Sequence, residues 1–186
     1  MSNARNLARL IVDSGGDVDV SSLGNVPPSN DASALTTGTL GSARLPAGSV
    51  LQVKQAVVHG TQQATTSTSF IDATGLTVDI TPTSASSKIL VMAHIEAGMG
   101  ASGANTTNRY QVVRNGTFIG MQSARHYDYG GTGVYGAQSI ALTILDAPAT
   151  TSSVTYKVQL QFLNGSNAFI NAENGSSSIT VMEISA

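Results

Sequence analysis

The sequence has no cysteine and no tryptophan, and only 11% of its 186 residues are charged. The absence of cysteine excludes disulfides, thiolate zinc sites, iron–sulfur clusters and cysteine nucleophiles. Typical domains are roughly 25% charged, and here the few charges nearly balance, with a net charge of -2 at pH 7. Such a chain has no electrostatic footprint for nucleic acid or for an anionic membrane, so we expect neither as a partner.

Long apolar runs are missing as well. No stretch approaches the about 18 apolar residues of a membrane span. Near the N-terminus the apolar run is only Leu10–Val12, which is too short for the central region of a signal peptide. The sequence therefore predicts no membrane insertion and no export signal.

Hydroxyl residues take the place of the missing charge, since 43 residues are Ser or Thr. Hydrophobic residues still reach 41%, which distinguishes the chain from disordered sequences of low hydrophobicity and high charge. The length allows one domain of ordinary size and at most a short additional arm.

Three regions differ in composition. Residues 1–26 contain a short apolar segment, a turn at residues 13–16 and a second alternating piece. Residues 27–49 are dense in Pro, Gly, Ser and Thr, which predicts an extended linker. Residues 50–186 have β-type alternation throughout, and we expect them to form the folded head.

Short alternating segments separated by turn residues recur along the head. Asn115-Gly116 is the strongest hairpin signal among them, because a type I′ turn needs positive φ at both positions. Residues 67–72 and 76–80 are predicted to form a pair broken at Gly75, and His94 is expected to be a half-buried, hydrogen-bonded strand residue. The predicted strands are 50–59, 67–72, 76–80, 87–97, 109–114, 117–122, 134–145, 154–163 and 178–184.

One strand shows its orientation clearly. Val154, Tyr156, Val158, Leu160 and Phe162 alternate with polar residues and should face inward. Eight to ten strands at this spacing predict an all-β fold, an antiparallel β-sandwich of jelly-roll type. A jelly roll and another Greek-key sandwich share the pattern, so the strand order stays open.

Residues that could carry catalysis are scarce. His59, His94 and His126 lie far apart and none has a histidine partner at metal-binding spacing. No nucleophile elbow or phosphate-binding loop stands between a strand and a helix. A glycan hydrolase would need a pair of carboxylates, and none is visible in the sequence after residue 100. We expect no catalytic residues, no metal and no cofactor.

One polar cluster is typical of a recognition surface. Arg125, His126, Tyr127, Asp128 and Tyr129 follow one another and precede two glycines. Aromatic rings stack on sugars or apolar groups, while Arg and Asp can hydrogen-bond hydroxyl groups. These five residues are the candidate ligand- or receptor-binding site; the alternative is a polar loop whose tyrosines cap a sheet or pack at a subunit contact.

The linker carries leucines at even intervals, Leu35, Leu40 and Leu45. An extended segment with this spacing can bury one side chain every few residues against a partner. The three leucines are therefore candidate contacts between subunits.

Several stretches resemble the junction and head of tailed-bacteriophage fibre proteins. The junction is LTTGTL at 35–40, continued by ARLP at 43–46 and GSVLQV at 48–53. The head pieces are 66–72, VDITPTSASSKILV at 78–91 and ITVMEI at 179–184, of which ITPTSASSKILV is the most specific. Residues 6–10 and 16–19 also resemble N-terminal pieces of such virion proteins.

The resemblance implies a non-enzymatic phage protein located on the virion. It implies a homotrimer of β-sandwich heads whose N-terminal arm contacts other virion proteins. Leu7, Arg9, Leu10 and Ile11 would be the attachment residues of that arm, and the linker leucines would meet around the trimer axis. The chain departs from the family in having only a linker where fibres usually have a long shaft.

Two functions follow from this resemblance. The first is a short tail fibre or receptor-binding knob that contacts a host cell-surface glycan through residues 125–129. The second is a capsid decoration or head-fibre protein whose arm crosses the outer capsid surface. The sequence leaves the choice between tail and capsid open, together with the receptor and the host.

Overall fold

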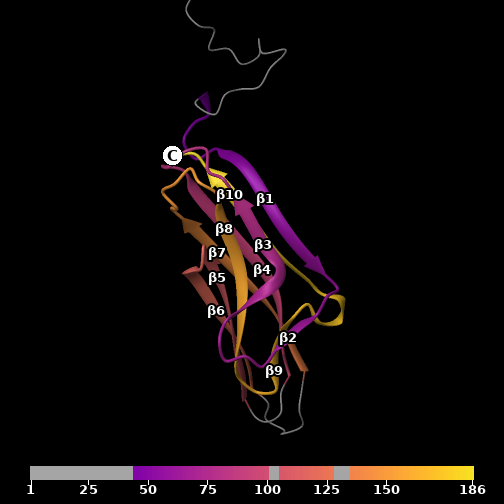
Figure 1. Ribbon diagram of the computed structural model, residues 1–186. Coiled ribbons are helices and arrows are strands. Elements are labelled where there is room, and N and C mark those ends of the chain that lie inside the picture. Colours follow the sequence, from indigo (N-terminus) through magenta and orange to yellow (C-terminus); the bar gives the residue numbers. More distant parts are fainter. Residues whose placement is uncertain (1–43, 101–104, 128–134) are drawn as a thin grey trace, which may run out of the picture. The chain divides into compact units, whose positions relative to one another are not determined.

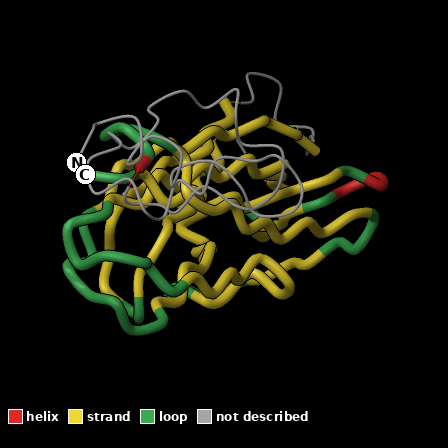
Figure 2. Tube along the Cα trace, turned by 90° about the horizontal axis from the view of Figure 1, so that it is seen from above, coloured by secondary structure: helices red, strands yellow, loops and turns green. Residues whose placement is uncertain are grey.

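The computed structural model describes residues 44–100, 105–127 and 135–186. Within these ranges the chain is almost entirely β-strand (Figure 1, Figure 2). The 3-10 helix η4, Ala172–Asn174, lies between the last two strands. The strands are β1 (Val50–His59), β2 (Gln63–Thr65), β3 (Ile71–Ile80), β4 (Lys88–Gly100), β5 (Asn105–Arg114), β6 (Thr117–Tyr127), β7 (Tyr135–Asp146), β8 (Val154–Asn164), β9 (Asn167–Ile170) and β10 (Ser176–Ile184).

The strands form two sheets of antiparallel pairs. One has the order β1-β10-β4-β7. In this sheet the short strand β9 pairs with β4 on the same side as β10 does, and β2 pairs with β9. The other has the order β3-β8-β5-β6. Along the sequence the pairings are nested. The β5–β6 pair lies between the paired strands β4 and β7, these lie between the paired strands β3 and β8, and all of them lie between the paired strands β1 and β10. Nested pairs divided between two sheets are the topology of a jelly roll, so the predicted β-sandwich is confirmed and its strand order is decided.

The core lies between the sheets and follows the two-residue period of the strands. Val154, Tyr156, Val158 and Leu160 of β8 are buried as predicted, while Phe162 packs half-buried against the same cluster. From the other sheet, β4 contributes the buried residues Ile89, Val91, Ala93, Ile95 and Ala97. Strict alternation therefore places one side of each sheet in the core and leaves the other side outside.

A buried tyrosine connects the two sheets. The Tyr110 hydroxyl on β5 donates to the Gly98 carbonyl of β4 at 3.2 Å and the Phe169 carbonyl of β9 at 3.0 Å. Burial raises the pKa of Tyr110 well above its usual range, so the hydroxyl stays a donor. Gly98 has no room for a side chain, because an added Cβ would lie 1.6 Å from the Phe169 ring.

Most predicted strands are found within a few residues of their expected ends. The Asn115-Gly116 hairpin is confirmed, with φ of 47° and 84° at its two residues. One pairing was wrong: residues 76–80 and the end of 67–72 belong to a single strand, β3. Gly75 produces an irregularity within that strand, with φ of 81° and a register shift between Asp72 and Thr77, rather than a hairpin.

The expected arm (1–26) and nearly all of the linker (27–49) lie outside the described residues. The same holds for the attachment residues Leu7, Arg9, Leu10 and Ile11 and for the linker residues Leu35 and Leu40. The division at residue 50 stays a prediction. In the part of the chain that is described, no helix has the length and apolar character needed to cross a membrane.

Candidate functional site

The described part of the candidate recognition set lies at one end of the sandwich. Arg125 and His126 are at the end of β6, where Arg125 is exposed and His126 is half-buried. The backbone of Tyr127 pairs with Asn105 at the start of β5. Asp128 and Tyr129 lie outside the described residues, so the five-residue site stays a prediction.

Side chains that the sequence analysis did not select hold the strands together at this end. Asn164 Oδ1 at the end of β8 accepts a hydrogen bond from the Thr107 amide on β5. Asn108 is buried on β5, and its Nδ2 donates to the Asn167 carbonyl of β9 at 3.2 Å. These contacts fix the ends of three strands beneath Arg125 and His126. Asn164 precedes a glycine in the sequence, whereas Asn108 carried no sequence signal.

The opposite end of the sandwich receives the chain from the linker (Figure 1). The Gly48 amide donates to the Ser185 carbonyl at 2.9 Å, and the Ser185 amide donates to the Ser49 carbonyl at the same distance. The Ser185 hydroxyl also donates to the Pro46 carbonyl at 2.9 Å. Leu45, the described leucine of the linker set, is half-buried here. The last linker residues are thus joined to the C-terminal strand.

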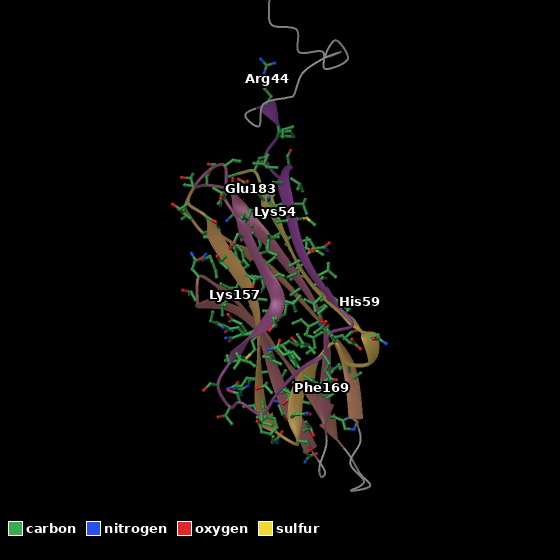
Figure 3. All side chains as sticks on the ribbon, turned by 45° about the vertical axis from the view of Figure 1, so that its right-hand side comes forward. Arg44, Lys54, His59, Lys157, Phe169 and Glu183 are labelled. Carbon is green, nitrogen blue, oxygen red and sulfur yellow. The ribbon has the colours of Figure 1, made fainter. Side chains whose placement is uncertain are left out.

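A buried carboxylate lies at this linker end. Glu183 on β10, labelled in Figure 3, is fully buried, and its Oε1 accepts from both the amide and the hydroxyl of Thr83, each at 2.7 Å. Gln52 Nε2 donates to Oε2 at 2.6 Å. Burial alone would raise the pKa of Glu183, but these hydrogen bonds outweigh burial and hold its pKa below the usual value. The carboxylate therefore joins the segment 78–91 to the segment 179–184, two of the three head pieces quoted for the phage resemblance.

A salt bridge near the same end is structural in character. Arg114 Nη1 contacts Asp146 Oδ1 at 2.7 Å and Oδ2 at 2.8 Å, and the Tyr156 hydroxyl donates to Oδ2 at 2.6 Å. Burial, assisted by the Asp146 carboxylate, raises the pKa of Tyr156 far above its usual range. The three residues connect β5, β7 and β8.

The histidines do not assemble into a site. His59 Nδ1 contacts the Ser176 hydroxyl at 2.6 Å. His94 is exposed, which corrects the expectation of a half-buried residue. It alternates with core residues of β4 and so faces outward from the sheet. Within residues 44–100, 105–127 and 135–186, no three His, Asp or Glu side chains are grouped so as to hold a metal ion.

The outward side of the β1-β10-β4-β7 sheet carries one row that is apolar on all four strands. Cross-strand register aligns Val53, Met182, Leu90 and Leu145 in one row across all four strands. The next row is Gln55, Thr180, Met92 and Thr143, and the third is Val57, Ser178, His94 and Ala141. Val53, Val57, Met92 and Leu145 are 53%, 57%, 41% and 59% exposed. We call these three rows the apolar face.

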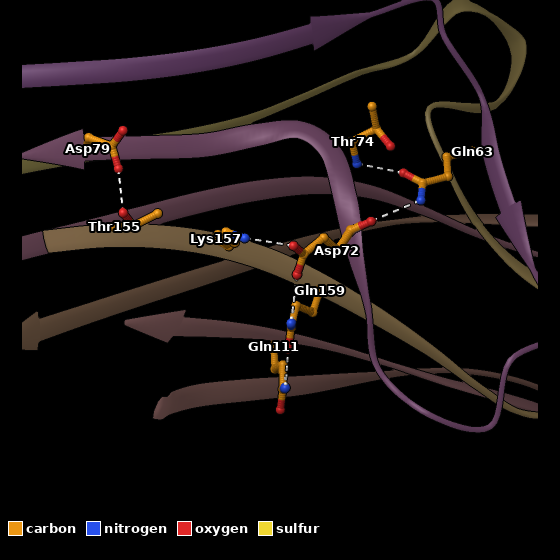
Figure 4. Close-up of polar contacts among 8 residues, drawn as sticks. All are labelled: Gln63, Asp72, Thr74, Asp79, Gln111, Thr155, Lys157 and Gln159. Carbon is orange, nitrogen blue, oxygen red and sulfur yellow. Dashed lines mark hydrogen bonds and ion pairs between the residues drawn. The ribbon is translucent and has the colours of Figure 1, made fainter. Parts of the chain in front are cut away.

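The outward side of the β3-β8-β5-β6 sheet is polar over its β3, β8 and β5 strands, where the side chains form hydrogen bonds and an ion pair with one another (Figure 4). Asp72 accepts from Lys157 Nζ at 2.8 Å and from Gln159 Nε2 at 2.7 Å. Gln111 Nε2 continues the chain of hydrogen bonds to Gln159 Oε1 at 2.7 Å. The hydrogen bonds from Lys157 and Gln159 lower the pKa of Asp72. We call this set the polar ladder.

Comparison with known proteins adds little to this description. The sequence matches no family and no curated protein. Among solved structures, the VP2 subviral particle of infectious bursal disease virus matches at 10% identity and a TM-score of 0.35. The match covers 74% of this chain and 34% of that one. A mutant VP2 in derived T=1 particles and the Gx strain of the same virus give the same TM-score and identity, with 37% and 32% of those chains covered.

This chain thus spans about a third of the VP2 chains it matches. The jelly-roll fold follows from the strand pairings of the chain itself.

Proposed function

We propose that this chain is a non-enzymatic surface protein of a phage virion, a short trimeric tail fibre or receptor-binding knob. Its residues 1–26 attach it to other virion proteins, and its jelly-roll head points away from them. Residues 125–129 contact a glycan of the host cell surface. The proposal combines the resemblance to fibre proteins with the arrangement of the head.

The observation that carries the proposal is the separation of two ends of the head. The linker joins at the end where Pro46 and Ser49 bind Ser185. Arg125 and His126 lie on β6 toward the opposite end, where β6 ends and β7 begins (Figure 1). A protein anchored by its N-terminus would therefore present these residues outward, which is the arrangement that an adhesin needs.

The chemistry at the outward end suits sugar recognition. Arg125 is exposed and offers a planar set of donors. Two tyrosines follow within four residues, and tyrosine combines a ring for stacking with a hydroxyl group for hydrogen bonding. The hydrogen bonds of Asn164 and Asn108 hold β5 to β8 and β9 next to the strand that carries Arg125 and His126.

Immunogold labelling of intact particles tests the location directly. Label at the tail end is the expected result, and label spread over the shell would replace the tail assignment by capsid decoration. In that case deletion of residues 1–26 should release the protein from the shell and lower particle stability. No label on any particle would contradict the virion location.

Adsorption to host cells tests the binding residues. Tyr127→Ala together with Tyr129→Ala should lower the adsorption rate by about 10-fold or more, because hot-spot aromatics each contribute about 2 kcal/mol or more. Phe118→Ala is the matched control, since Phe118 is an aromatic residue at the other end of β6 and is 57% exposed. Equal adsorption of the double variant and the control would exclude residues 127–129 as the receptor contact.

A further inference from the structure

The apolar face is an unusual surface for a free domain. In antiparallel sheets the solvent-facing side normally carries polar residues, as the polar ladder does here. On the apolar face the row Val53-Met182-Leu90-Leu145 crosses the whole sheet, and Met92, two residues along β4 from Leu90, extends it into the next row. A contiguous apolar patch of this kind marks an interaction surface.

The scarcity of charge on this face fits a second copy of the same chain as its partner. Across the three rows His94 is the one titratable side chain, with Lys88 and Glu96 just beyond the rows on β4. In a symmetric assembly, side chains close to the rotation axis meet their own copies, so a charge there would face an identical charge. A face of aliphatic, Met, Thr, Ser and Gln side chains avoids that repulsion, and interface cores are depleted of charge in the same way.

The point at which residues 46–49 meet the head supports the same partner. The segment that contains the evenly spaced leucines reaches the head at Pro46–Ser49 and continues directly into β1, the edge strand of this sheet. The first residue of β1, Val50, is 50% exposed and pairs with Ile184, next to the apolar row. A contact between linkers would therefore continue onto the apolar face without interruption.

We propose that copies of this chain associate through the apolar face of the β1-β10-β4-β7 sheet, turned toward a common axis. The polar ladder then forms the outside of the assembly. This inference deepens the trimer of the proposed function by assigning its principal contact to the sheet in addition to the linker leucines. It does not depend on whether the particle carries the protein on its tail or on its capsid.

Two methionines offer a matched pair of variants. Met92 on β4 is 41% exposed at the centre of the apolar face, and Met121 on β6 is 40% exposed on the outward side of the other sheet. Met92→Glu should convert an assembly of three times the 19.0 kDa chain mass into a 19.0 kDa monomer in light scattering at micromolar concentration. The assembly formed by the full-length Met121→Glu chain should have the same mass as the wild-type assembly.

A cross-linking experiment covers the case in which Met92→Glu fails to fold. Because the chain lacks cysteine, Met92→Cys introduces a single thiol. A short bismaleimide should link Met92→Cys subunits into covalent dimers, whereas Met121→Cys should stay uncoupled under the same conditions.

Three results would overturn the inference. A monomeric wild-type chain would show that the head does not self-associate. An assembly unchanged by Met92→Glu would place the contact elsewhere, and equal cross-linking of the two cysteine variants would do the same. Each of these outcomes is independent of particle labelling, so the proposed virion role and the proposed interface can fail separately.

Discussion

The outward sides of the two sheets are built on the same alternation but differ in chemistry. On the β3-β8-β5-β6 sheet, Asp72, Lys157, Gln159 and Gln111 bond to one another across three strands. On the β1-β10-β4-β7 sheet, the equivalent positions are Val53, Met182, Leu90 and Leu145. A surface whose polar side chains bond to one another needs only water as its neighbour, whereas covering a surface of exposed aliphatic side chains lowers the free energy.

The inward and outward sides of the sheets contribute to two different free energies, that of folding and that of association. The inward side of both sheets stabilises the fold, and the polar ladder adds only weak surface interactions to it. The apolar face contributes to association rather than to the stability of one chain. Substitutions on the inner sides and on the two outer faces should therefore produce effects of different size and different concentration dependence.

The largest effect is expected inside the sandwich. Leu160→Ala on β8 removes a fully buried side chain and should lower the free energy of unfolding by about 2–5 kcal/mol. Leu145→Ala on the apolar face should change it by less than about 0.5 kcal/mol. Urea denaturation measures both, in the Met92→Glu background so that association does not contribute. Equal losses for the two leucines would show that Leu145 is part of the core.

A smaller loss is expected at the linker end. Glu183→Gln replaces an acceptor of three hydrogen bonds by a group whose amide would face a donor, which should cost about 1–3 kcal/mol near neutral pH. Because the folded pKa of Glu183 is below the usual value, its contribution is present above the ordinary carboxyl pKa. The contribution is lost as the pH falls through the folded pKa.

Denaturation of wild type and Glu183→Gln between pH 7 and pH 3 checks this linkage. The difference in unfolding free energy between the two chains should be constant near neutral pH and should shrink below the ordinary glutamate pKa of 4.5. A difference that grows on acidification would show that the carboxylate is not the stabilising form.

The smallest effect is expected on the polar ladder. Asp72→Asn removes the ion pair with Lys157, in which both side chains are more than a third exposed. Exposed pairs of this kind contribute about 0.2–1 kcal/mol, and salt screens them. Thermal unfolding at low and high salt should show a small loss that nearly disappears at high salt. A loss as large as that of Leu160→Ala would mean that the ladder is part of the folding core.

Local pattern was sufficient for much of the fold. The alternation of β8 placed Val154, Tyr156, Val158 and Leu160 inward, and Asn115-Gly116 specified its hairpin, because both signals act over neighbouring residues. Gly75 was misread as a turn, since positive φ at a glycine serves a bulge within a strand as well as a hairpin. His94 was misplaced because alternation shows that two sides exist but not which side another layer covers.

The sequence alone determined that the chain is a cysteine-free, weakly charged β protein, because composition and two-residue periodicity are local properties. Only the tertiary structure decided the nested pairing of β1 with β10 and of β4 with β7, since pairing joins residues far apart in the chain. The same pairing brought Val53, Met182, Leu90 and Leu145 into one row and joined Thr83 to Glu183. Those neighbours are separated by dozens of residues, and no window along the sequence contains them together.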